Sequence, residues 1–166
     1  TDGRSGLRNL IARIFKWRVD VRYYAYVTLI PVGLFTFACI LNRVLTGNWP
    51  NLTLLGEVHY LPYLTPLGAL GIWFITFGLG EETGWRGYAL EPLQRRYGPI
   101  AGTLILALLW ATWHTPTFFI VETYRTMTVP IIVGGFGLGI CAGALVLSRI
   151  SQQTNGSVLA VALWHA

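Results

Sequence analysis

The chain has 166 residues, of which 54% are hydrophobic and only 11% are charged. An ordinary soluble domain carries roughly 25% charged residues, so this chain has too few to cover a water-facing surface. The composition therefore excludes a soluble globular enzyme, a disordered chain and a coiled coil. The net charge of +5 fits either a nucleic-acid partner or a membrane surface, and the positions of the basic residues distinguish the two.

A basic segment, residues 1–22, precedes the first long apolar run. It holds six of the twelve Lys and Arg side chains, namely Arg4, Arg8, Arg13, Lys16, Arg18 and Arg22. Apolar residues recur between them at helical spacing, from Leu7 to Val21, which predicts an amphipathic helix over residues 4–21 in the membrane interface. We therefore expect residues 1–22 to be a juxtamembrane segment that binds anionic lipid, and we expect no nucleic-acid partner.

Residues 23–166 are predicted to form the membrane core, because they consist mainly of long apolar runs separated by polar turns. The runs cover 23–45, 62 or 66 to 96, 100–121, 131–150, and a last one that opens near Ser157. The first four are long enough for helices that cross a hydrocarbon layer of about 30 Å. The fifth stops at Ala166, so we expect a C-terminally truncated core. The predicted fold class is an all-α polytopic membrane helix bundle with about five spans and an N-terminal interfacial helix.

The distribution of Lys and Arg among the loops predicts the orientation of the chain in the membrane. The N-terminal segment has six of them and the 86–98 region has three, whereas the 46–61 loop has none. Because cytoplasmic loops are enriched in Lys and Arg, we expect a cytoplasmic N-terminus and an outer 46–61 loop.

Ionisable side chains inside apolar spans are the main chemical signal of this sequence. A charged residue in a spanning helix costs roughly 2.5–3.5 kcal/mol on insertion scales, so each one needs a partner or a function. Glu82 and His114 are equally distant in sequence from Gly98, one before it and the other after it. In an antiparallel hairpin both would lie about 20–24 Å from the turn. His165 enters from the same side in the last span, so the three are predicted to converge on one buried point suited to acid–base or metal chemistry.

The two adjacent glutamates are predicted to have different roles. Glu82 and Arg86 stand at positions i and i+4, so we expect them to form a charge-compensating pair on one helix face. Glu81 is turned by about 100° from Glu82 and is expected to face the cavity as the catalytic carboxylate. Gly84 shares the face of Glu81, and its missing side chain predicts that another helix approaches closely there.

Three short motifs resemble those of the CPBP family of membrane proteins. Residues 81–87 (E-E-T-G-W-R-G) resemble the motif E-E-x-x-x-R, residues 110–114 (W-A-T-W-H) resemble F-x-x-x-H with Trp in place of Phe, and residues 162–165 (A-L-W-H) resemble the start of H-x-x-x-N. The Asn of the third motif would fall beyond Ala166. The family includes type II CAAX prenyl endopeptidases and bacterial lysostaphin-resistance and bacteriocin-immunity proteins. The resemblance implies an integral protein of a prokaryotic cell membrane that hydrolyses a peptide or membrane-protein substrate.

The resemblance implies one of two mechanisms. In the first, Glu81 and His114 activate a water without metal, and His165 stabilises the oxyanion together with the missing Asn. In the second, Glu81, His114 and His165 bind a divalent metal such as zinc, which acidifies the water. No H-E-x-x-H motif supports a zinc site independently, so we favour the first mechanism, which needs no cofactor. A divalent metal such as zinc is the alternative.

Two other classes of function stay open at this point. A non-proteolytic immunity or scaffold protein of the same family would keep the fold without turnover. A proton-coupled transporter would use Glu81, His114 and His165 as a proton relay. Transporters usually contain internal repeats, and the sequence shows none, so the endopeptidase is the preferred prediction.

Overall fold

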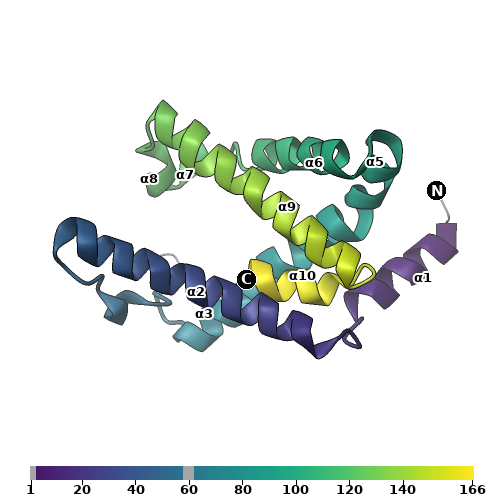
Figure 1. Cartoon of the computed structure of the whole chain (residues 1–166), viewed down its shortest axis with the longest axis horizontal. Coiled ribbons are helices and arrows are strands. Elements are labelled where there is room, and N and C mark those ends of the chain that lie inside the picture. Colours follow the sequence, from purple (N-terminus) through teal and green to yellow (C-terminus); the bar gives the residue numbers. More distant parts are fainter. Residues whose placement is uncertain (1–2, 58–61) are drawn as a thin grey trace.

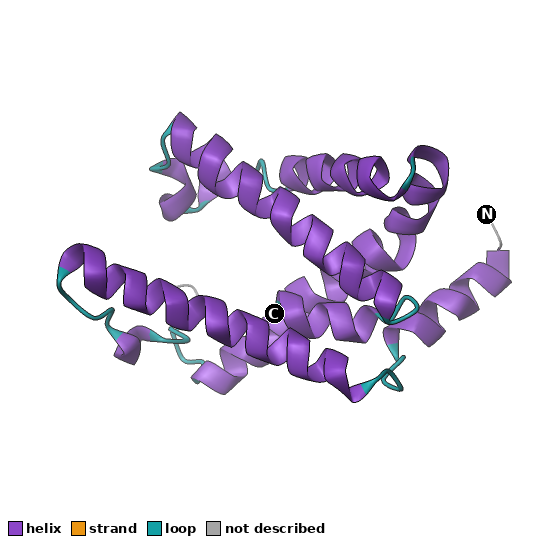
Figure 2. Ribbon diagram, in the orientation of Figure 1, coloured by secondary structure: helices purple, strands orange, loops and turns teal. Residues whose placement is uncertain are grey.

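The computed structural model describes residues 3–57 and 62–166. Within these ranges the chain consists of helices and loops and contains no strand (Figure 2). In chain order the helices are α1 (Gly3–Ile14), α2 (Val21–Thr46), η1 (Leu52–Leu54), α3 (Pro66–Trp73), η2 (Phe74–Glu81), α4 (Glu82–Gly84), η3 (Trp85–Ala89), α5 (Leu90–Tyr97), α6 (Pro99–Trp113), α7 (Thr117–Ile120), α8 (Glu122–Arg125), η4 (Ile131–Gly137), α9 (Leu138–Gln153) and α10 (Val158–His165). The predicted all-α fold class is confirmed.

In the described part of the chain, three helical segments are long and apolar enough to cross a membrane. They are α2, the segment Pro99–Ile120 that joins α6 to α7, and the segment Ile131–Gln153 made of η4 and α9. Most of their surface is left uncovered by the protein, as expected for helices that face lipid. The predicted membrane helix bundle is thus present, although the segment 66–97, which carries the charged motif, and the short helix α10 do not meet the same criteria.

The N-terminal segment forms α1, which turns one face toward the rest of the protein. Leu7 and Ile11 of α1 are exposed, as is Phe15 just after the helix. The helix also contacts η3 and α10. The helix predicted for residues 4–21 already ends at Ile14, and α2 begins at Val21. The side chain of Asp20 caps α2 by accepting the N–H of Arg22 at 2.9 Å, which satisfies a backbone donor that has no partner inside the helix.

The segment 66–97 is continuously helical, as predicted, but its hydrogen-bond pattern changes along the way. Thr65 caps the start of α3 through its side-chain oxygen. After α3 the chain becomes the π-helix η2, then the single α-helical turn α4, then the second π-helix η3. A π-helical turn holds more residues than an α-helical one and re-aims the side chains that follow, and such turns are frequent at functional sites. Glu81 and Glu82 lie at the junction of η2 and α4.

The helix α10 lies inside the packed part of the bundle, between α2 and α9 (Figure 1). Its small residues Ala160 and Ala162 have no exposed surface. A Cβ atom at Gly78 of η2 would lie 2.8 Å from the carbonyl oxygen of Ala162, so only glycine permits this approach. A Cβ atom at Gly84 would meet nothing within 4 Å. The close approach predicted at Gly84 is therefore wrong, and it occurs at Gly78, where it holds α10 beside the two glutamates.

Candidate active site

Glu82 and Arg86 form a buried ion pair. Arg86 Nη1 donates to Glu82 Oε1 at 2.7 Å, and the exposed fractions of the two side chains are 1% for Arg86 and 0% for Glu82. The contact that the i, i+4 spacing predicted is therefore present in the structure. Each charge in such a low-dielectric environment is tolerated because the other compensates it.

His165 also contacts Glu82. The sequence predicted that the two residues converge at one depth, but it gave Glu82 only Arg86 as a bonding partner. The distance from His165 Nδ1 to Glu82 Oε1 is 2.7 Å, so one carboxylate oxygen bonds both the guanidinium and the imidazole. An ionised carboxylate only accepts hydrogen bonds, so Nδ1 carries the hydrogen and Nε2 is left for other contacts. The structure thus gives Glu82 a second partner, whereas the sequence suggested that it only compensates Arg86.

Trp110 connects the surroundings of Glu81 to both histidines. Its indole Nε1–H donates to Glu81 Oε2 at 2.8 Å. Its ring centroid lies 5.8 Å from that of His114 and 5.3 Å from that of His165, and the guanidinium carbon of Arg86 lies 4.7 Å from it. Trp110 is 6% exposed. It is the residue that brings side chains from α6, α10 and the η2–α4 junction around one centre.

The sequence marks Trp110 as a motif position. Its indole N–H is a second signal, which indicates a bonding partner in another helix. An indole N–H inside an apolar span has no water to bond, so it needs an acceptor from another element. Few acidic side chains lie in the apolar runs, and Glu81 and Glu82 are adjacent in the neighbouring helix. The candidate acceptors are therefore Glu81 and Glu82, and only the structure shows that Trp110 bonds Glu81.

His114 follows α6 as its C-cap and bonds back to that helix. Its Nδ1 atom lies 2.8 Å from the carbonyl oxygen of Trp110. Because a carbonyl oxygen only accepts, Nδ1 is the donor, and Nε2 is left for other contacts. The ring is half-buried and lies 5.5 Å from the ring of Phe136. The bond to the Trp110 carbonyl thus fixes the orientation of the His114 ring at the end of α6.

The three residues of the metal alternative do not form a cluster of ligands. Across residues 3–57 and 62–166, no group of three or more His, Cys, Asp and Glu side chains lies close enough together to hold a metal ion. Glu81 is bonded to Trp110, and His165 is bonded to Glu82. The arrangement of these side chains does not fit a zinc site formed by Glu81, His114 and His165.

Several buried polar atoms of the site have no partner among the described residues. They are Glu82 Oε2 and the Nε and Nη2 atoms of Arg86. A buried polar atom without a partner is costly, and such atoms are commonly bonded by ordered water. The unpaired atoms therefore mark where water would enter the surroundings of the ion pair.

Comparison with known proteins places this site in a family. The family described as type II CAAX prenyl endopeptidase Rce1-like matches residues 63–166, which include all five predicted site residues. The chain belongs to this family. The resemblance to CPBP proteins that the three motifs predicted is thereby confirmed. Together with the three long apolar helices, it identifies the chain as an integral membrane protein.

A curated relative covers almost the whole chain. The chain is 23% identical over 162 residues to the protein named CAAX prenyl protease 2 of Methanococcus maripaludis. The aligned region is 95% of this chain and 59% of that protein, so the chain spans little more than half the length of this relative. No solved structure matches the chain.

Proposed function

We propose that the protein is an intramembrane endopeptidase of the CAAX-protease type that uses a glutamate and histidines to activate water. The observation that carries the proposal is the gathering of Glu81, His114 and His165 around Trp110. Family membership supports it, because the same segment that forms this site matches the Rce1-like family. The proposed substrate is a peptide segment at or near the membrane surface.

The water is activated by Glu81 and His114. Trp110 holds Glu81 through Oε2, which leaves Oε1 to accept a proton. The Nε2 atom of His114 accepts a hydrogen bond from the same water and orients it. As the water oxygen bonds to the scissile carbonyl carbon, its proton moves to Glu81, which passes it to the leaving amine when the C–N bond breaks.

His165 stabilises the negative charge that develops on the carbonyl oxygen. The carboxylate of Glu82 beside Nδ1 compensates the charge of an imidazolium, whose Nε2–H then donates to the oxyanion. In this mechanism Glu82 acts on the substrate through His165. The two neighbouring glutamates thus have separate roles, one toward the water and one toward the oxyanion.

The decisive experiment compares Glu81→Gln with Glu122→Gln in the purified full-length protein. Glu122 is an exposed acid on α8, so it is a matched control. Loss of a general base costs about 10²–10⁴-fold in turnover. We expect that loss for Glu81→Gln, a wild-type rate for Glu122→Gln, and equal melting temperatures. Prenylated and unmodified forms of one peptide, assayed in parallel, define the substrate class.

The alternatives give different results in the same experiments. Absence of cleavage by the folded wild type would favour an immunity or scaffold protein. A proton flux in proteoliposomes that Glu81→Gln abolishes would favour a transporter. Turnover that falls on chelation and returns with zinc would contradict the metal-free mechanism.

A further inference from the structure

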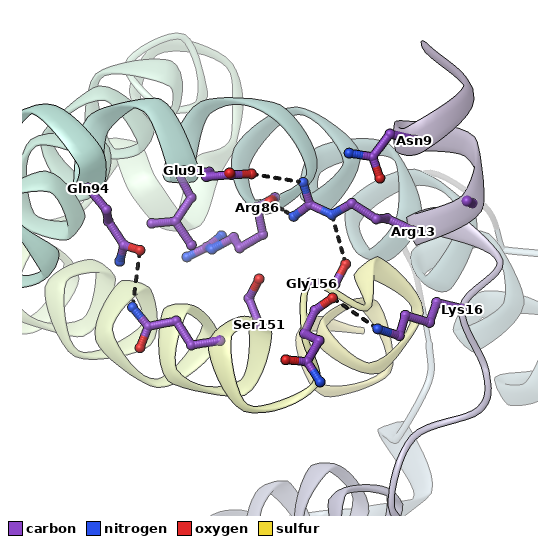
Figure 3. Close-up of a pocket in the computed structure, with 12 residues that line it drawn as sticks. Asn9, Arg13, Lys16, Arg86, Glu91, Gln94, Ser151 and Gly156 are labelled. Carbon is purple, nitrogen blue, oxygen red and sulfur yellow. Dashed lines mark hydrogen bonds and ion pairs between the residues drawn. The ribbon is translucent and has the colours of Figure 1, made fainter. Parts of the chain in front are cut away.

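The side chain of Arg13 connects α1 to two other segments of the protein. Its Nε donates to the carbonyl oxygen of Gly156 at 3.0 Å, its Nη1 to that of Gly87 at 2.9 Å, and its Nη2 to that of Arg86 at 2.8 Å. We call these three bonds the Arg13 bridge. Figure 3 shows the bonds to Gly156 and Arg86, beside Glu91, whose carboxylate lies 3.7 Å from Nη1. The Arg13 side chain is 16% exposed. It points toward the backbone carbonyls of these two segments.

The two bridged segments are those that carry the ion pair and the last histidine. Arg86 and Gly87 belong to η3, which follows Glu82 closely. Gly156 precedes α10, which ends at His165. The segments are far apart in the sequence, so only the fold brings them together. Arg13 therefore fixes the start of α10 relative to η3, and this relation determines where His165 meets Glu82.

Further contacts make the junction specific. Ser157 Oγ donates to the carbonyl oxygen of Lys16 at 2.6 Å and accepts the N–H of Ala160 at 3.1 Å, so the N-cap of α10 is itself bonded to the end of the N-terminal segment. Lys16 Nζ donates to the carbonyl oxygen of Asn155 at 3.1 Å. A Cβ atom at Gly156 would lie 2.7 Å from Arg13 Nε, so a larger residue would displace the guanidinium.

We propose that Arg13 is a positioning residue of the active site, which acts by holding α10 against η3 so that His165 Nδ1 contacts Glu82. This inference rests on the proposed endopeptidase function. The sequence suggested that Arg13 binds anionic lipid with the other basic residues of the N-terminal segment. Arg4 and Arg8 are exposed and remain available for lipid, whereas Arg13 is committed to backbone carbonyls.

The geometry of the bridge requires arginine. A guanidinium presents five N–H donors in a rigid plane, so it bonds carbonyl oxygens of two segments at a fixed separation. A lysine ammonium is a point donor that cannot reproduce this fork, although it keeps the positive charge. A change of Arg13 to Lys therefore separates positioning from electrostatic attraction to lipid.

The first experiment compares Arg13→Lys with Arg8→Lys, a matched change at an exposed position of the same helix. Misplacement of a catalytic group by about 1 Å costs on the order of 100-fold in rate. We expect kcat for Arg13→Lys to fall by about 10- to 100-fold while KM changes less than about twofold. Arg8→Lys should match the wild type. Equal kcat for the two variants, or a change in KM alone, would overturn the proposal.

In a second experiment, free guanidinium is added to Arg13→Gln to replace the missing guanidinium of the Arg13 side chain. A cavity of about 480 Å³, lined by Arg13, Lys16, Arg86 and Gln152 among others, lies beside the bridge and is large enough to admit the ion. Guanidinium should restore kcat, and methylammonium at the same concentration should not. Guanidinium, but not methylammonium, should also restore the protection of the amides of residues 158–162 from hydrogen exchange. Failure of guanidinium to restore either quantity would refute the positioning role.

The hydrogen-exchange measurement tests the positioning role of Arg13 without relying on peptide cleavage. If the wild type cleaves no peptide, the endopeptidase proposal fails, while the protection of residues 158–162 with and without guanidinium still reports on the bridge. If Arg13→Gln does not fold, Arg13→Lys is measured in the same way. Normal protection of α10 in a folded Arg13→Lys protein would show that the bridge does not position it.

Discussion

Changing Glu82 to Gln tests the buried ion pair and its link to His165. Gln keeps the size of the side chain but removes its charge, and Arg86 would then be an uncompensated cation with 1% of its surface exposed. Breaking a buried pair from one side costs about 3–5 kcal/mol. For a chain of this size each kcal/mol corresponds to about 2–4 °C, so we expect a fall in melting temperature of about 6–20 °C.

The double variant Glu82→Gln/Arg86→Met separates stability from catalysis. Replacing the guanidinium by an apolar side chain removes the orphan charge, so much of the melting temperature should return. Activity should stay low, because His165 still lacks the carboxylate beside its Nδ1. A double-mutant cycle on melting temperature and turnover, measured on the same preparations, gives both quantities.

Two results would refute this reasoning. Recovery of activity together with stability in the double variant would mean that Glu82 only compensates Arg86, as its spacing alone suggested. A stronger coupling of Arg86 to Glu81 than to Glu82 would mean that the roles of the two glutamates are exchanged. The cycle with Glu81→Gln/Arg86→Met is therefore the control, and we expect it to show little coupling.

Three further predictions concern other parts of the molecule. Trp110→Phe removes the N–H that holds Glu81, and turnover should fall about tenfold, equivalent to about 1.4 kcal/mol, with a smaller change in melting temperature. Gly78→Ala places a Cβ atom 2.8 Å from the carbonyl oxygen of Ala162, so thermal unfolding should show a loss of about 1–3 kcal/mol, whereas Gly84→Ala should not destabilise the protein. A single cysteine at Asn51, in an otherwise cysteine-free background, should react with an impermeant reagent only from the outside. Labelling from the cytoplasm would reverse the predicted orientation.

The charged motif lies where the hydrogen-bond pattern of its helix changes. In a regular α-helix Glu81 and Glu82 would differ in direction by about 100°, with their neighbours at α-helical positions. Here η2 ends at Glu81, and η3 begins at Trp85, shortly after Glu82. The two carboxylates bond different helices, Glu81 toward Trp110 of α6 and Glu82 toward His165 of α10.

The sequence by itself determined the features that depend on local patterns. Long apolar runs dictate helices in lipid, because every backbone group must be bonded within its own segment. The spacing of Glu82 and Arg86 places them on one face of any helix. The cost of ionisable groups in apolar spans marked the residues of the candidate site, and three ordered motifs indicated the family.

Only the tertiary structure decided which of these residues meet. The contact of His165 with Glu82, the bond of Trp110 to Glu81, and the orientation of Arg13 toward η3 and α10 each join segments far apart in the sequence. Such contacts depend on how closely helices approach and on how π-helical turns re-aim side chains. Neither quantity follows from periodicity, since periodicity gives the face of a helix and not the helix that covers it.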